Sequence, residues 1–472
     1  MPLCVDLDGT LIRTDALVEG VLALATRPAL AGALLGLRDG DRARFKRRIA
    51  AAAGLDPALL PYHQGLLAYL RQQRAAGRHL VLVTAADRAV ADAVALHLGI
   101  FDEVMASDGV RNLKGRAKRL ALVARFGERG FAYAGDSAAD LHVWQSAAAA
   151  ILVNASGATA AAARGMVPIE REFADRPPAA LGLLRAMRPH QWVKNLLVFV
   201  PILAAGAALT PAALLAALIA FAAFCATASG IYLLNDLTDL AADRAHPRKR
   251  NRPFASGAVA LTVGLAAGLL LVAVGAGLAW LGGILAVVAL YAVLSISYSA
   301  RLKEQPLVDV FMLAALYTIR LVGGGEATGH RVSLWLLAFS SFLFLGLALV
   351  KRVGELGAAA GKGDGQLARR GYQSADIPIL QMFGCSASVA ASLVLALFVQ
   401  SEALTGRYAT PALLWGVVPL VLFWQCRIWL STTRGYMHDD PIVYAARDWV
   451  SWIVAGATAL LALAARFITI AV

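Results

Sequence analysis

Long apolar runs separated by short polar breaks occupy the chain from about Leu196 onward, whereas residues 1–185 carry charges throughout. A bilayer core about 30 Å thick requires roughly 20 apolar residues per helix. The pattern therefore predicts an all-α polytopic membrane domain of about nine transmembrane helices. The expected spans lie near 193–209, 212–234, 258–279, 281–298, 307–323, 333–350, 378–400, 411–430 and 450–470.

The first part of the chain has a different periodicity. Short apolar segments such as 80–87 (LVLVTAAD) end in polar residues and alternate with helical patterns, which predicts an α/β doubly wound parallel sheet. The apolar segment 17–37 is interrupted by Glu19, Arg27 and Pro28, which favours a small helical cap over a transmembrane helix. We expect three parts: a soluble domain at 1–172, a linker at 173–184 and a membrane domain at 185–472.

Composition and charge support a membrane setting. The chain is 59% hydrophobic and 16% charged, and its net charge of +13 is concentrated in the breaks between apolar runs. Basic loops of this kind face anionic lipid and anionic substrates, which argues against nucleic-acid binding. The N-terminus (MPLCVDLDGT) lacks the features of a signal peptide, so we expect the soluble domain and the basic loops on the cytosolic side of the inner (plasma) membrane.

Polar side chains follow the predicted strands of the soluble domain. Asp6 and Asp8 come directly after a short apolar strand, in a turn opened by Gly9. Two carboxylates one residue apart at a strand end suit a nucleophile and an acid/base partner beside a shared metal. The further polar residues of the series are Thr84, Lys114, Asp136 and Asp140.

In this order and spacing, the four elements resemble the haloacid dehalogenase superfamily of phosphatases. The resemblance implies that Asp6 attacks phosphorus and that Asp8 protonates the leaving group and later activates water. It also implies that Thr84 and Lys114 hold the phosphoryl oxygens. The Mg²⁺ ligands that it implies are Asp6, Asp8, Asp136 and Asp140. A regulatory domain of the same fold without turnover is the alternative.

An acidic segment ends the second predicted span. At about 100° per residue, Asn235, Asp236, Asp239 and Asp243 share one helical face. Carboxylates packed so closely would repel one another without a cation between them, and hard oxygen ligands suit Mg²⁺. The basic loop that follows offers phosphate ligands, namely Arg248, Lys249, Arg250 and Arg252.

This arrangement resembles the UbiA superfamily of intramembrane prenyltransferases, over roughly residues 185–472. Aromatic-prenylating members usually carry a second aspartate pair, but here Asp309 is followed four residues later by Leu313. The chain looks more like the decaprenyl-phosphate phosphoribosyltransferase branch. The segments that carry this likeness are 188–195 (RPHQWVKN), 235–253, 298–303 (YSARLK) and 350–356 (VKRVGEL).

The branch resemblance implies phosphoribosyl diphosphate as donor and a polyprenyl phosphate as acceptor, with Mg²⁺ held by Asp236, Asp239 and Asp243. Asp309 is a candidate catalytic residue, and Asp309 and Arg320 could instead pair with each other. Asp439 and Asp440 receive no role. The candidate substrate-binding residues are Lys194, Asn235, Arg248, Lys249, Arg252, Lys303, Arg320, Lys351 and Arg352. Each basic residue at a helix end could instead be a topology anchor.

The fusion suggests a reaction sequence in which the soluble domain removes the 5-phosphate that phosphoribosyl transfer leaves on the lipid-linked sugar. One alternative is an aromatic or quinone-type polyprenyltransferase with an attached phosphatase. Another is a transporter or receptor with a cytosolic regulatory domain, although an acidic cluster at a helix end beside a basic loop is more typical of an enzyme site. The sequence leaves open whether the protein forms a homo-oligomer.

Overall fold

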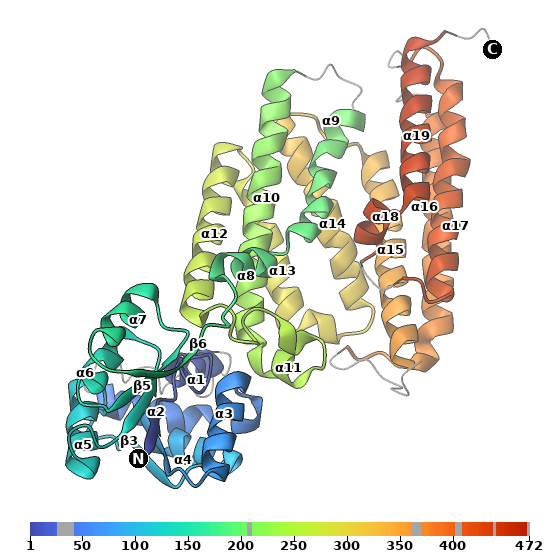
Figure 1. Ribbon diagram of the computed structural model, residues 1–472. Helices are drawn as coiled ribbons and strands as arrows, with labels where there is room; N and C mark the ends of the chain where they lie inside the picture. Colours follow the sequence, from blue (N-terminus) through green and yellow to red (C-terminus); the bar gives the residue numbers. More distant parts are fainter. Residues whose placement is uncertain (26–41, 205–209, 361–369, 402–407, 438–439, 470–472) are drawn as a thin grey trace. The chain divides into compact units, whose positions relative to one another are not determined.

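The computed structural model describes residues 1–25, 42–204, 210–360, 370–401, 408–437 and 440–469 (Figure 1). The chain divides into two compact units. Unit 1 comprises Met1–Met187 and Tyr232–Gly268, and unit 2 comprises Arg188–Ile231 and Leu269–Val472. The acidic segment and its basic loop thus group with the soluble domain, whereas the sequence-based boundaries count them in the membrane domain.

A six-stranded sheet forms the centre of unit 1, in the order β3-β2-β1-β4-β5-β6. Every neighbouring pair is parallel. Strand order reverses at β1, which pairs with β2 on one side and β4 on the other, so the expected doubly wound sheet is confirmed. The strands are β1 (Leu3–Val5), β2 (Leu80–Asp87), β3 (Glu103–Ser107), β4 (Ala132–Gly135), β5 (Ala149–Val153) and β6 (Ile169–Phe173).

Helices supply apolar side chains to both faces of this sheet. In β1, Leu3 and Val5 join one buried cluster with Leu66, and Cys4 joins another with Trp144. Burial on both faces explains why the strands read as continuous apolar runs. The helices of this part are α1 (Ala16–Ala25), α2 (Arg42–Ala53), α3 (Gln64–Ala75), α4 (Arg88–Leu98), α5 (Arg116–Phe126), α6 (Leu141–Trp144), α7 (Gly157–Arg164) and α8 (Ala179–Ala186).

Helices α1 and α2 form a small cap that follows β1 in the chain. They pack so closely that a Cβ added to Gly20 would lie 2.5 Å from the Ile49 side chain. Leu24, Ile49 and Ala53 make a small apolar cluster of their own. Residues 26–37 of the expected cap segment lie outside the described residues.

Long apolar helices build unit 2, and several of them run side by side in Figure 1. Successive helices from α13 to α17 pack on one another, and α19 packs on α17. The helices are α9 (Val200–Ala204), α10 (Pro211–Thr238), α12 (Leu261–Leu281), α13 (Leu285–Ala300), α14 (Val308–Thr328), α15 (Leu334–Ala360), α16 (Ile377–Gln400), α17 (Val417–Thr433), α18 (Pro441–Arg447) and α19 (Trp449–Phe467). Of these, α10 and α12 begin in one unit and end in the other.

The membrane spans identified among the described residues are fewer than the nine expected. Within the described part of the chain, seven helices are long and apolar enough to cross a membrane. The expected span at 281–298 is the shorter apolar helix α13. The expected span at 193–209 begins as a 3₁₀ helix, Pro189–Phe199, followed by the five-residue α9. A multi-pass helical domain is therefore confirmed, but the count of nine is not.

Candidate active sites

The phosphatase-type site lies where β1 and β4 end. Asp6 follows the last paired residue of β1, and Asp136 follows Gly135 at the end of β4. Gly9 has a positive φ of 77°, and a Cβ at this position would lie 2.3 Å from Asp136 Oδ2. The turn after β1 therefore requires glycine because it passes directly against a site carboxylate.

Lys118, in the first turn of α5, contacts the expected nucleophile. Its Nζ lies 2.9 Å from Asp6 Oδ2, and the Lys118 side chain is 3% exposed. The same ammonium donates to the Tyr133 hydroxyl at 2.8 Å, and this hydroxyl donates to Asp140 Oδ1 at 2.8 Å. The lysine is thus fixed in position from both sides.

The lysine that contacts Asp6 is Lys118, whereas the sequence pattern predicted Lys114 for this role. Lys114 stands four residues earlier, before Gly115, and its side chain is exposed and lines a cavity beside the cap. The sequence around them (NLKGRAKRL) offers two lysines one helical turn apart. Only the packing of α5 against Tyr133 distinguishes them.

Three carboxylates at this edge form a candidate metal site. Oxygen atoms of Asp6, Asp136 and Asp140 all lie within 4.8 Å of one another. Asp140 is held by the backbone N–H and hydroxyl of Ser137, each at 3.0 Å. Such an all-oxygen donor set fits Mg²⁺. Asp8, the fourth expected ligand, does not belong to this group in the described residues.

The electrostatics of the site fit a group of carboxylates that can hold a cation. Burial, followed by repulsion from Asp140 and Asp6, raises the pKa of Asp136 to about 7. Burial also raises the pKa of Asp6, against the opposing effect of Lys118. A divalent cation among these groups would offset both the burial and the repulsion.

Asp8, the expected general acid and base, lies at the start of the cap. Its Oδ1 accepts a hydrogen bond from the Ala16 N–H at 2.8 Å, at the start of α1. Burial and the nearby charge of Asp15 raise the pKa of Asp8 to about 7. A carboxyl group with a pKa near neutrality can both donate and accept a proton at physiological pH.

Thr84 lies near the end of β2, two residues beyond the Val5–Leu82 pair and therefore at the same edge of the sheet as Asp6. Its side chain is fully buried, and its hydroxyl oxygen accepts a hydrogen bond from the Ala86 N–H at 2.9 Å. The hydroxyl hydrogen remains available to donate to a phosphoryl oxygen.

The acidic segment of unit 1 spans the end of α10 and helix α11 (Leu240–Ala245). Regular helix is interrupted at Asp239, although its N–H still bonds to the Asn235 carbonyl at 3.0 Å. Arg252 lies between two of the carboxylates, 3.1 Å from Asp236 Oδ1 and 2.8 Å from Asp243 Oδ2. Carboxylates packed this closely need a positive charge between them, and in this conformation the Arg252 guanidinium supplies it.

The basic loop beyond α11 presents two of the predicted phosphate ligands to solvent. Arg248 and Lys249 are exposed, and both of their backbone N–H groups donate to His246 Nδ1. Arg244, which the sequence analysis did not assign to the site, forms a two-pronged ion pair with Glu19 of α1 at 2.7 and 2.6 Å. The Glu19–Arg244 ion pair therefore joins the cap to the acidic segment within unit 1.

A cluster in unit 2 centres on Asp440, to which the sequence analysis gave no role. Asp440 Oδ2 lies 2.7 Å from Lys194 Nζ and 3.2 Å from Lys351 Nζ. The Tyr317 hydroxyl donates to the same carboxylate at 3.0 Å. Two of the predicted phosphate-binding lysines therefore share one buried carboxylate. Asp439 lies outside the described residues.

Asp309 and Arg352 form a second buried pair in unit 2. Arg352 Nη2 lies 2.5 Å from Asp309 Oδ2, and both side chains are 0% exposed. Tyr372 donates to the other oxygen of Asp309, and Arg352 also pairs with Glu355. This geometry favours a structural role over the substrate roles expected for Asp309 and Arg352.

Arg320 does not pair with Asp309, which was one of the alternatives. Its Nε donates to Asn195 Oδ1 at 2.7 Å, its Nη2 donates to the Tyr291 hydroxyl at 3.2 Å, and its guanidinium stacks on the Tyr291 ring. Arg320 is therefore held by neutral partners within the helical core. Lys303 lies on a short 3₁₀ turn, Leu302–Glu304, between α13 and α14.

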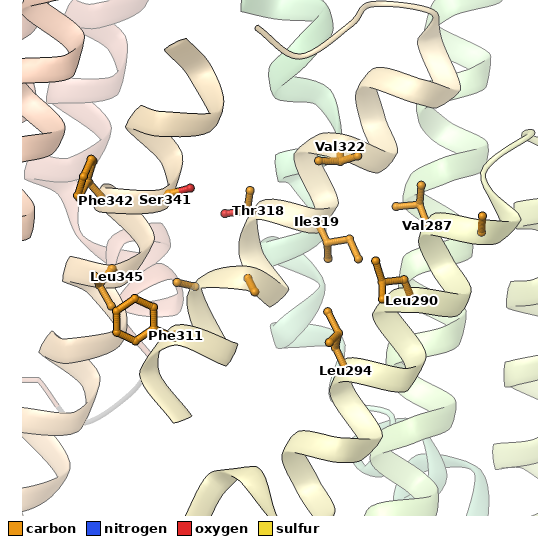
Figure 2. A pocket seen from close by; sticks show the side chains of 13 residues that line it. Val287, Leu290, Leu294, Phe311, Thr318, Ile319, Val322, Ser341, Phe342 and Leu345 are labelled. Carbon is orange, nitrogen blue, oxygen red and sulfur yellow. The ribbon is translucent and has the colours of Figure 1, made fainter. Parts of the chain in front are cut away.

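An apolar cavity of about 660 Å³ opens between α13, α14 and α15 (Figure 2). Its labelled lining is hydrocarbon, including Leu290, Phe311 and Leu345, apart from the hydroxyls of Thr318 and Ser341. Such walls suit a hydrocarbon chain and not a charged group.

Comparison with known protein families divides the chain into two parts, and the acidic segment falls in the second. The haloacid dehalogenase-like hydrolase family matches residues 3–145, and the UbiA prenyltransferase family matches residues 196–444, more than half of the chain. The protein is thus a UbiA-type membrane transferase fused to a haloacid dehalogenase-like hydrolase domain. The chain belongs to the UbiA prenyltransferase family.

Particular relatives resemble different extents of the chain. Protein y4nM of Sinorhizobium fredii, named as uncharacterised, is 38% identical over 460 residues, covering 96% of this chain and 89% of that protein. The decaprenyl-phosphate phosphoribosyltransferase of Corynebacterium glutamicum is 38% identical over 198 residues, covering 40% of this chain and 59% of that protein. Among solved structures, a UbiA homologue from Archaeoglobus fulgidus bound to DMAPP and Mg²⁺ is 16% identical, with a TM-score of 0.46 over 59% of this chain and 98% of that one.

Proposed function

We propose that the soluble domain is an active phosphomonoesterase, and the observation that carries this is the contact between Lys118 and Asp6. Asp6 attacks the phosphorus atom, the ester P–O bond breaks, and Asp8 donates a proton to the departing alcohol. Asp8 then takes a proton from water, whose oxygen attacks phosphorus and displaces Asp6 to release inorganic phosphate. Lys118 and Thr84 stabilise the phosphoryl oxygens. The exposed Lys114 is a proposed second cation at the substrate.

Asp6, Asp136 and Asp140 would hold Mg²⁺ in this domain, and Asp8 is the further ligand that the family resemblance suggests. When bound, the ion would neutralise charge on the phosphoryl group. The chain's own residues supply nucleophilic attack, proton transfer and positioning. A regulatory domain without turnover is disfavoured because each of these roles has a residue in place.

We propose that the membrane domain transfers a 5-phosphoribosyl group from phosphoribosyl diphosphate to a polyprenyl phosphate. The similarity to a decaprenyl-phosphate phosphoribosyltransferase supports this donor and acceptor. A lipid phosphate oxygen attacks the anomeric carbon, and the bond from this carbon to the diphosphate breaks. Asp236, Asp239 and Asp243, with Asn235 beside them, would bind Mg²⁺-diphosphate once Arg252 turns from the carboxylates to the phosphates.

The remaining cations are proposed phosphate ligands of unequal strength. Lys194 and Lys351 already converge on one anionic group, the Asp440 carboxylate, which supports an anion-binding role for them. Arg248 and Lys249 are exposed and therefore accessible to a soluble donor. Lys303 and Arg320 are proposed as phosphate ligands on the sequence pattern alone. Arg352 as a phosphate ligand and Asp309 as a catalytic residue have the least support, because their charges neutralise each other.

The proposed transferase and phosphatase reactions would follow one another on the same lipid-linked sugar. Phosphoribosyl transfer leaves a phosphomonoester on the lipid-linked sugar, and the soluble domain removes it to give a polyprenyl-phosphoryl-ribose. Tethering raises the effective concentration of the second site, often to about the millimolar range. We place the soluble domain and the basic loops in the cytosol, because phosphoribosyl diphosphate is a soluble anion and the basic residues concentrate on that side.

The test uses purified full-length protein in detergent with Mg²⁺, labelled phosphoribosyl diphosphate and a polyprenyl phosphate. We expect label in the lipid phase with the wild type and with Asp6→Ala, but not with Asp236→Ala. Only Asp6→Ala should accumulate a lipid product that still carries the 5-phosphate. Prenylation of an aromatic acceptor from a polyprenyl diphosphate, without any label in the lipid, would instead support the aromatic prenyltransferase alternative.

A further inference from the structure

A cavity of about 310 Å³ lies between the cap helices and the sheet domain, next to the acid/base Asp8. One part of its wall is apolar and comes from α1, α2, α4 and the loop after α2, through Leu17, Phe45, Ile49, Leu55 and Val90. The alcohol part of a phosphomonoester bound at Asp6 must leave on the side of Asp8, so this cavity is where the alcohol would sit.

Two ammonium groups enter the same cavity. Lys46 of α2 donates from Nζ to the Ala85 carbonyl at 2.7 Å and to Asn112 Oδ1 at 3.2 Å, which fixes its position with neutral acceptors. Lys114 contributes a second, more exposed ammonium. Among the described residues, the polar contacts of the Lys46 ammonium are with these two neutral acceptors, although the Asp8 and Asp15 carboxylates are near enough to act on it electrostatically. Burial lowers the pKa of Lys46, against the opposing effect of the Asp8 and Asp15 carboxylates, and the charge of Lys114 lowers it further.

The cavity also contains carboxylates other than Asp8, but these have local functions. Asp15 accepts the N–H groups of Leu17 and Val18 at 2.9 and 3.1 Å, and so caps α1. Asp87 accepts the Ala89 N–H at 3.0 Å and caps α4. Negative charge at a helix N-terminus is offset by the helix dipole. The lysines are therefore the charges that remain for a ligand.

We propose that this cavity selects phosphomonoesters whose alcohol carries a second anionic group with an apolar substituent. Lys46 and Lys114 bind the second anion, and the apolar wall from α1 and α2 contacts the substituent. The inference rests on the proposed phosphatase function and sharpens its substrate class. A sugar 5-phosphate with a phosphodiester to a lipid at its anomeric carbon has this chemistry, whereas a simple sugar phosphate does not.

The test compares two soluble probes with full-length protein in detergent and Mg²⁺. One is butyl riboside 5-phosphate, and the other carries a butyl phosphodiester in place of the butyl ether at the anomeric carbon. We expect kcat/KM to be about tenfold higher for the phosphodiester probe, since charge-assisted hydrogen bonds of this kind are strong. Lys46→Met and Lys114→Met should each lower this preference, mainly through KM, with kcat little changed.

Arg48→Met is the matched control, because Arg48 is an exposed cation on the same helix that does not line the cavity. It should keep the full preference, and Lys46→Arg should keep most of it. Equal hydrolysis of the two probes by the wild type, or a preference that survives both lysine variants, would overturn the inference while leaving the phosphatase function standing. Hydrolysis of neither probe, with label still reaching lipid in the transfer assay, would overturn the phosphatase function and the inference with it.

Discussion

Glu19 and Arg244 form a buried, two-pronged ion pair, with 5% and 7% of their side chains exposed. Glu19 belongs to α1, whose first N–H group, from Ala16, holds Asp8. Arg244 stands next to Asp243 in α11 and also donates from Nε to the Ala255 carbonyl at 2.9 Å. The cap of the hydrolase domain is therefore joined to the acidic segment through one pair of side chains.

We expect Glu19→Ala to lower the stability of unit 1 by roughly 3–5 kcal/mol, because it leaves a buried guanidinium without its counter-charge. The measurement is the thermal midpoint of the full chain in detergent. The double variant Glu19→Ala/Arg244→Leu should recover much of the loss, since no buried charge then remains.

The exposed pair Arg88–Asp92 provides the control for this prediction, with side chains 57% and 51% exposed. Removing Arg88 should cost at most about 1 kcal/mol, because water screens such pairs. A midpoint for Glu19→Ala as high as that of Arg88→Ala would show that the Glu19–Arg244 contact contributes little.

Lys118→Met should reduce phosphatase kcat by about 10²–10³-fold, because its ammonium contacts Asp6 and would stabilise charge on the phosphoryl group. Lys114→Met should act mainly on KM, because its side chain lines the cavity beside Asp8. Hydrolysis of a small phosphate ester measures both, and transfer of label to lipid should be unchanged. A larger kcat loss for Lys114→Met than for Lys118→Met would return the catalytic role to Lys114.

Metal-free protein should lose stability as pH rises from about 4 to about 7. The pKa values of Asp8 and Asp136 are raised from 3.8 to about 7 by burial and neighbouring carboxylates, so the folded state holds more protons than the unfolded state across this window. The free energy of unfolding is therefore greatest below pH 3.8, the pKa of these groups in the unfolded state. It falls as the pH rises towards about 7, their pKa in the folded state.

Mg²⁺ should raise the thermal midpoint more at pH 8 than at pH 5.5, because protons compete with the ion for the carboxylates. Asp136→Asn should weaken both the pH dependence and the response to Mg²⁺. Asp92→Asn, at an exposed carboxylate of α4, should change neither. An Mg²⁺ response that is the same in Asp136→Asn and the wild type would place the ion elsewhere.

Asp309→Asn and Asp236→Asn should fail in different ways. Arg352 is completely buried against Asp309, so Asp309→Asn should lower the thermal midpoint strongly. Arg252, the partner of Asp236, is 30% exposed and can be solvated, so Asp236→Asn should stay folded but lose transfer of label to lipid. A stable Asp309→Asn protein without transfer activity would support the catalytic role that the sequence pattern suggested.

Local pattern was sufficient for the two fold classes and for much of the hydrolase site. Apolar runs long enough to span a bilayer predicted the helical membrane domain, and strand-end carboxylates predicted the crevice at β1 and β4, because parallel strands end at one edge of a sheet. Helix lengths were less predictable. The first part of the segment 189–204 winds as a 3₁₀ helix and α13 is shorter than a full span, so the expected count of nine is not confirmed in the described residues.

Local sequence pattern predicted the two fold classes and the carboxylates that follow the strands, whereas the packing of whole helices sets which charged side chains come into contact. Lys114 and Lys118 are equivalent by composition and spacing, and only the contact of Lys118 with Tyr133 and Asp6 separates them. Lys194 and Asp440 are 246 residues apart, and Glu19 and Arg244 are 225 apart. Pairings over such separations depend on how whole helices pack, and no local periodicity encodes that.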